Sequence, residues 1–380
     1  AGTAITTGDD NVLVGYSAGD AITTGTRNVA VGTGAAGTNV SGDYNVAVGY
    51  ESLTTSTASQ NTALGFRSLR SDTTGADNVA IGRSALQENT SASNNVAVGH
   101  LSLKNNTTGT QNVAVGALAL DANTTASYNT AVGYNALTAN TTGADNTAVG
   151  RTALENNTTA DNNTAVGKAA LAQNTTGASN TALGSLALNL NTTGISNTAV
   201  GKSALGANTT ANANTAVGYN SLTANTTGTE NTAVGTEALN ATITGSYNTA
   251  VGRSALLLTT GDHNTAVGRI ALRTNSSGAN NTALGSRSMY SNSSGGNNTA
   301  VGVNALDANT TASNNTAIGY RAGTTTTTGA DNVAVGSDAL FANTTGASNV
   351  AIGHDALGEN TTASNNTAVG MSALVANTTG

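Results

Sequence analysis

A five-residue motif, Asn, Thr or Val, Ala, Val/Leu/Ile and Gly, returns along the whole chain at a nearly constant spacing. It occurs 22 times between Asn11 and Asn366, and 19 of the 21 intervals are 17 residues long, while those starting at Asn45 and Asn248 are 16. We number the unit from its Asn, and the consensus is NTAVGxxALxxNTTGxx. Residues 1–380 therefore form one continuous repeat region, with no capping unit visible, and a sustained short period predicts a solenoid of stacked coils.

The first part of the unit favours a short strand followed by a turn. Positions 2 to 4 are rich in β-branched residues, and position 5 is Gly in every copy, as at Gly133, Gly150 and Gly167, because Gly adopts positive φ without steric cost. A second short apolar stretch follows, as in residues 134–138, and then a segment rich in Asn, Thr and Gly, as in residues 139–145, which is typical of a loop. The pattern predicts an all-β protein, a parallel β-solenoid or β-roll of 17-residue coils.

Composition limits how such a chain builds a core. The chain has 46 Gly, no Pro, Cys or Trp, and only 3% aromatic residues, so the core of each coil must be thin and made of Ala, Val and Leu. The net charge of −7 argues against binding of nucleic acid, which requires cationic side chains at the phosphates. No run of 18 apolar residues is present, and we expect no insertion into a membrane.

Asn recurs at two positions of the unit, at position 1 in all 22 copies and at position 12 in most. We expect the side chains of Asn129, Asn146 and Asn163 to stack into a structural ladder whose amides bond along the solenoid axis, next to a column formed by the position 5 glycines. A row of polar ligand-binding sites is the alternative interpretation. Asn-x-Ser/Thr sequences at position 12, as at Asn123 and Asn140, are also formal glycosylation acceptors, although the turn alone explains them.

Both faces of the predicted strand carry apolar residues. Neighbours in a strand point to opposite faces, yet Ala148 stands beside Val149, and this recurs nearly throughout. We expect the larger rows, Val149 and Leu154 with their equivalents, to fill the coil interior. We expect the small Ala row to pack closely between chains, and this predicts self-association. The residues of this expected assembly interface are Ala131, Ala148, Ala165 and Ala182.

Residues that could carry catalysis or bind a metal do not converge in the sequence. His100, His263 and His354 lie many units apart, so they cannot share one metal ion, and the chain has no Cys. No grouping of Ser, His and Asp is held together by a predicted cavity. We therefore expect no enzyme activity, no catalytic residues, no metal and no cofactor. Position 6 collects Tyr, Arg, Lys and His, and this stripe either contacts glycans by stacking or is simply a solvated edge.

The repeat resembles a known set of sequences. NTAVGYNALTANTTG at residues 129–143 resembles the repeats of long tail or appendage fibres from aquatic bacteria and their phages. It is similar, more distantly, to the left-handed β-roll head repeats of trimeric autotransporter adhesins. The resemblance covers essentially the whole chain. It implies a parallel homotrimer that projects from a virion or a cell surface, and therefore an extracellular location.

The leading functional hypothesis is the structural shaft of an extracellular or virion-attached adhesive fibre, which extends a binding tip outside this sequence. Such a tip would contact a host receptor or a surface glycan. The first alternative is a solenoid surface that binds ice or glycans, because Thr fills position 2 from Thr130 to Thr316. The second alternative is a filament that polymerises end to end.

Overall fold

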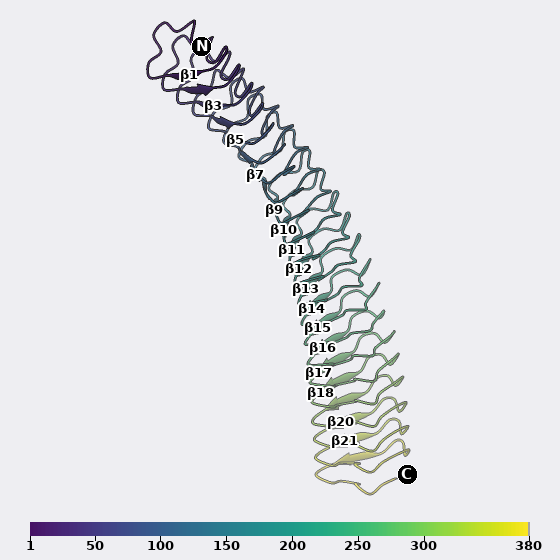
Figure 1. The fold of residues 1–380 in the computed structure, drawn as a ribbon. Helices are drawn as coiled ribbons and strands as arrows, with labels where there is room; N and C mark the ends of the chain where they lie inside the picture. Colours follow the sequence, from purple (N-terminus) through teal and green to yellow (C-terminus); the bar gives the residue numbers. More distant parts are fainter. Residues whose placement is uncertain (379–380) are drawn as a thin grey trace. The chain divides into compact units, whose positions relative to one another are not determined.

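The structure, a computed structural model, describes residues 1–378, in which every regular element is a three-residue strand and none is a helix (Figure 1). The chain divides into two compact units, Ala1–Thr193 and Gly194–Gly380. The first contains β1 to β11 and the second β12 to β22. Each unit is a parallel β-solenoid with one strand per coil of about 17 residues, as the repeat predicts. The strands are Val12–Val14, Val29–Val31, Val46–Val48, Thr62–Leu64, Val79–Ile81, Val96–Val98, Val113–Val115, Thr130–Val132, Thr147–Val149, Thr164–Val166, Thr181–Leu183, Thr198–Val200, Thr215–Val217, Thr232–Val234, Thr249–Val251, Thr265–Val267, Thr282–Leu284, Thr299–Val301, Thr316–Ile318, Val333–Val335, Val350–Ile352 and Thr367–Val369.

The stacking keeps one register along each unit. Thr147 in β9 pairs with Thr164 in β10, so like residues lie above one another from coil to coil. The register also survives the two 16-residue coils, since Val46 pairs with Thr62 and Thr249 pairs with Thr265. The missing residue lies in the loop after position 12, because Ser56 still occupies that position and donates a hydrogen bond to the next coil. The loop therefore absorbs the length change, while the strand and core do not shift.

The core of each coil is a single thin layer. Ala148 at position 3, Ala153 at position 8 and Leu154 at position 9 are fully buried, and their equivalents are buried in coil after coil. These small side chains allow the two sides of the coil to approach closely. The Leu row therefore lies in the coil interior, as expected from the sequence.

Three positions of each coil adopt the left-handed backbone conformation, which the sequence pattern does not predict. These are positions 7, 9 and 17, occupied in one coil by Thr152 (φ 57°), Leu154 (φ 51°) and Asn162 (φ 59°), and the equivalent positions repeat this geometry along the chain. Non-glycine residues lose roughly 1–2 kcal/mol each in this region. Hydrogen bonds between coils hold these positions in place, because the backbone N–H of Thr152 donates to the O of Tyr134 (3.0 Å) and that of Leu154 to the O of Ala170 (3.1 Å).

The glycine at position 5 is required by close contact between coils. Gly150 has φ 138°, and a Cβ added there would lie 2.5 Å from the carbonyl oxygen of Gly167. Gly133 faces Gly150 in the same way, at 2.6 Å. A side chain at this position would meet the backbone of the next coil, so the glycines form a continuous column along each unit.

We expect Gly150→Ala to lower the free energy of unfolding by about 3 kcal/mol or more, because it combines a strained φ with a backbone clash. Urea unfolding, with hydrogen exchange to locate the damage, measures this. Gly34→Ala is the matched control, because Gly34 also has positive φ (68°) but its added Cβ would meet nothing closer than 3.8 Å. The control should lose only about 1 kcal/mol. Equal losses in both variants would contradict the close-contact explanation.

Candidate interaction surface

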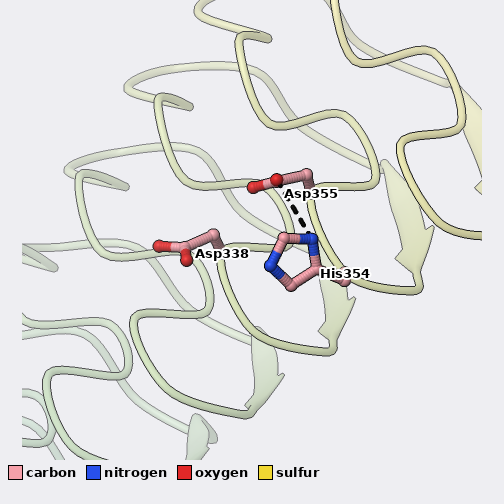
Figure 2. Close-up of side chains that lie close together, drawn as sticks. All are labelled: Asp338, His354 and Asp355. Carbon is pink, nitrogen blue, oxygen red and sulfur yellow. Dashed lines mark ion pairs between the residues drawn. The ribbon is translucent and has the colours of Figure 1, made fainter.

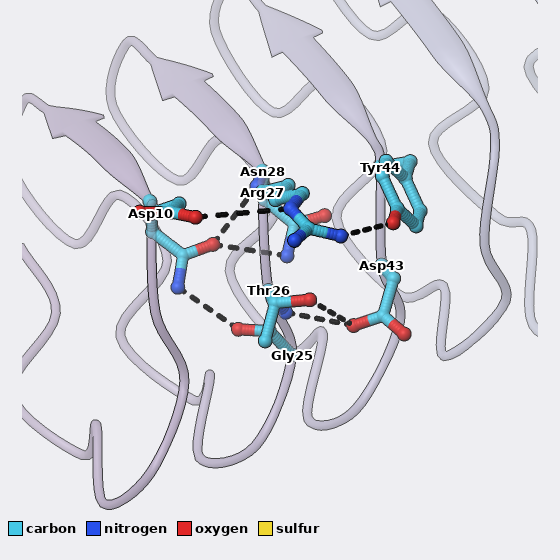
Figure 3. Close-up of polar contacts among 8 residues, drawn as sticks. Asp10, Gly25, Thr26, Arg27, Asn28, Asp43 and Tyr44 are labelled. Atoms are coloured by element: carbon cyan, nitrogen blue, oxygen red, sulfur yellow. Dashed lines mark hydrogen bonds and ion pairs between the residues drawn. The ribbon is translucent and has the colours of Figure 1, made fainter.

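The Asn side chains at position 1 form the expected ladder inside each unit. Asn146 donates its backbone N–H to the Oδ1 of Asn129 (3.0 Å) and its Nδ2 to the O of Ala160 (2.8 Å). Asn163 donates its N–H to the Oδ1 of Asn146 at 3.0 Å. These side chains are fully buried, so they join consecutive coils and are closed to a ligand from solution. Figure 3 shows the first step of the ladder, in which Asn28 donates from its N–H and its Nδ2 to the side chain of the Asn one coil earlier.

A second ladder runs through position 12. Asn140 donates from its Nδ2 to the Oδ1 of Asn123 (3.2 Å) and to the O of Gly143 (2.8 Å). Asn157 continues the row with a 3.0 Å bond to Asn140. Because these side chains are fully buried, the Asn-Thr-Thr sequences at position 12 between Asn106 and Asn360 do not present an accessible amide for glycosylation in the folded coil.

The expected assembly interface is corrected by the burial of the Ala row. Ala131, Ala148, Ala165 and Ala182 have no exposed surface within the single chain, so they fill the coil interior and cannot contact another chain. The reason is that alternate residues of a strand point to the same face. Position 1 points inward to form its ladder, and position 3 must then point inward too. The Val row at position 4, which the sequence places in the coil interior, lies on the opposite face of the strand.

The face of the sheet that points away from the coil interior carries two parallel rows of side chains, from positions 2 and 4. We call it the outward face. Position 2 is Thr or Val, and position 4 is Val, Leu or Ile. Most position 4 side chains are partly buried, and the more exposed ones include Leu183 (47%), Leu284 (47%) and Ile318 (42%). The strand register places each residue beside its equivalent in the next coil, so the apolar row is continuous within each unit. Contiguous exposed apolar surface of this kind marks a site of interaction.

Near its C-terminal end the structure brings together a group that the sequence analysis missed. Asp338, His354 and Asp355 lie close to one another on two adjacent coils (Figure 2). The Nδ1 of His354 pairs with Asp355 at 3.0 Å, while the Nε of Arg321 pairs with Asp338 at 3.2 Å. Each carboxylate therefore already has a cationic or hydrogen-bonding partner. Contact between coils, rather than spacing in the sequence, creates this cluster.

A cavity of about 490 Å³ lies beside this cluster. It opens because Gly358 occupies position 10, where the coils before and after carry Phe341 and Val375. The guanidinium of Arg321 covers the ring of Phe341 at 4.1 Å from its centroid. The cavity is thus a notch in a row of side chains, and of its charged groups Arg321 pairs with Asp338 while Asp355 pairs with His354.

Comparisons with known proteins add no identity to this chain. No protein-family model matches it, and the comparison with curated proteins finds no similar sequence. Among the described residues there is no helix long and apolar enough to cross a membrane.

One ladder position carries a buried acid. Asp72 replaces Asn at position 12, is fully buried, and accepts hydrogen bonds from the hydroxyl of Ser56 (2.7 Å), the Nδ2 of Asn89 (2.7 Å) and the N–H of Gly75 (3.1 Å). Burial raises the pKa of Asp72 to about 6, and these hydrogen bonds only partly oppose the effect. All three donors are neutral.

The raised pKa of Asp72 makes the folded protein less stable as the pH rises. Between the unfolded pKa of 3.8 and about 6, the unfolded chain releases the proton of Asp72 before the folded coil does, so stability falls as pH rises. The loss is on the order of 3 kcal/mol and is complete above pH 6. Asp72→Asn should remove this loss, and the variant should exceed the unmodified protein in stability at pH 7.5 but not at pH 4. Hydrogen exchange of residues 61–77 at both values measures it, and an equal difference at the two values would contradict the assignment.

Proposed function

We propose that this chain is the structural shaft of an extracellular or virion-attached fibre, and that copies of it associate through the outward face, with three chains in the assembly. The observation that carries the proposal is the in-register row of partly or fully exposed Val, Leu and Ile at position 4. A chain that repeats one coil without interruption gains length, and at about 4.8 Å per coil the eleven strands of one unit extend for roughly 50 Å. A long repeat region without a group of reactive side chains suits a spacer that carries a binding tip elsewhere.

Association follows from the energetics of the outward face. Full burial of an exposed Val or Leu side chain is worth about 1.5–3 kcal/mol, and each partly exposed residue of the row gains a fraction of this on association. Thr and Val at position 2 broaden the surface, and their small size permits close approach of two sheets. A single chain leaves this surface in water, whereas a closed ring of chains covers it in every copy.

The outward face can be tested with three substitutions in adjacent coils. Val132→Glu, Val149→Glu and Val166→Glu leave the coil interior untouched, because these side chains point outward and are only partly buried. In an assembled fibre each Glu would be buried without a partner, at a cost of several kcal/mol. We expect the combined variant to be a folded monomer, with unchanged circular dichroism and one third of the mass of the unmodified assembly by sedimentation equilibrium.

The control places the same charges on the loop. Thr142, Thr159 and Thr176 are exposed at position 14, so their replacement by Glu should leave the assembly intact. An unmodified chain that is monomeric at all accessible concentrations would rule out the proposal, and so would a Val variant that stays assembled.

Ice binding is the second candidate, and one observation favours it. The Thr residues at position 2 lie in register, as Thr215 beside Thr232 and Thr232 beside Thr249, so their hydroxyls repeat at the coil spacing on a flat sheet. Position 4 adds no second row of hydroxyls. We therefore expect no thermal hysteresis from the purified chain, and faceting of ice crystals at micromolar protein would favour ice binding over the shaft.

A further inference from the structure

The two edges of the outward face carry opposite charges. The leading edge consists of positions 16 and 17, immediately before each strand and its Asn, and the trailing edge is position 6, immediately after the Gly. The charged residues of the leading edge are Asp9, Asp10, Arg27, Asp43, Asp77, Asp145, Asp161, Glu230, Asp262 and Asp331. Those of the trailing edge are Arg83, Arg151, Lys168, Lys202, Arg253 and Arg269. Acids thus predominate at positions 16 and 17, and the permanently charged residues at position 6 are all cations.

The opposite charges also tend to share a coil. Four of the six trailing-edge cations follow a strand that an acid precedes. Each of these four pairs brackets one strand, with the acid at one end and the cation at the other. The pairs are Asp77 and Arg83 around β5, Asp145 and Arg151 around β9, Asp161 and Lys168 around β10, and Asp262 and Arg269 around β16.

These charges have no ionic partner within the chain. All eight residues are exposed, and none of them is among the ion pairs formed by residues 1–378. The two members of a pair cannot reach each other, because the residues between them span about 20 Å of extended chain. Water solvates these charges in the single chain, and any ionic partner that they gain when the outward face is covered comes from what covers it.

Symmetry decides which copy orientation satisfies these charges. Rotation about an axis parallel to the solenoid, by 120° for three chains, keeps the copies parallel and their coil levels aligned. The trailing edge of one copy then faces the leading edge of the next at the same coil level, and cation meets acid. Rotation about an axis parallel to the strands gives an antiparallel copy, in which acid faces acid and cation faces cation. An axial offset between parallel copies would also separate the coil-matched pairs.

We propose that the partner covering the outward face is a second copy of this chain in parallel orientation with no axial offset, and that ion pairs between the trailing edge of one copy and the leading edge of its neighbour set this arrangement. The inference rests on the proposed self-association and adds its direction and register. Arg151 of each copy faces Asp145 of the neighbour, and Arg83 faces Asp77 in the same way.

Charge reversal on one edge tests the proposal. Arg83→Glu with Arg151→Glu converts two attractive contacts per interface into repulsive ones, and we expect association to weaken roughly tenfold or more per interface at low salt. High salt should narrow the difference between this variant and the unmodified chain. Sedimentation equilibrium measures both.

The swapped variant supplies the control for folding. Addition of Asp77→Lys and Asp145→Lys to the reversed chain restores opposite charges on facing edges, and association should return. Failure of the swap to restore it would overturn the proposal, as would an assembly that ignores the reversal. If the unmodified chain never associates, that result would instead overturn the proposed function, and this inference would fall with it.

Cysteine cross-linking tests the register independently, since the chain contains no Cys. A chain with Asp161→Cys and Lys168→Cys should form covalent oligomers on mild oxidation, because the two edges of β10 meet across the interface. A chain with Asp161→Cys and Arg83→Cys places the thiols five coils apart, roughly 24 Å, and should not. Cross-linking of the second chain but not the first would overturn the parallel arrangement without offset.

Discussion

The hydrogen bond from each Asn amide group to the neighbouring coil is the interaction on which the rest of the fold depends. At position 1 the side chain accepts the backbone N–H of the next Asn, and its own Nδ2 donates to the loop carbonyl at position 15 of the same unit, as Asn146 does with Ala160. Strand and loop are thereby joined at every level. Because a three-residue strand alone is too short to hold a sheet together, these side chains supply the missing connections.

The closed coil explains where the apolar residues go. With Asn at position 1 inside, Ala at position 3 shares the interior with Leu at position 9, and alternation along the strand places positions 2 and 4 on the opposite face. Val and Thr therefore lie outside. The coil uses small residues for its own core and presents its larger β-branched residues to solvent, which makes the outward face the surface with the most to gain from association.

Much of this architecture could be predicted from the sequence, and the errors have physical causes. The period, the strand, the Gly turn and the Asn ladder follow from residue types that recur in fixed places. The sequence predicts the Val row inside the coil and the Ala row outside, and the structure shows the reverse. Alternation along a strand shows only that Ala148 and Val149 face opposite ways. Burial of Asn146 decides which way. The left-handed conformation of Leu154 could not be predicted, because hydrogen bonds between coils override its local preference. The cluster at His354 depends on contacts between coils.

The central claim is that the Asn ladder closes each coil within one chain, and residue-resolved hydrogen exchange tests it most directly. The backbone N–H of Asn146 is bonded to the Asn129 side chain and should exchange as slowly as the strand amide of Thr147, which donates to the O of Asn163 at 2.8 Å. Protection should persist in a dissociated monomer. Exchange of the Asn146 amide at the rate of an unprotected loop, or its loss of protection on dissociation, would contradict the account.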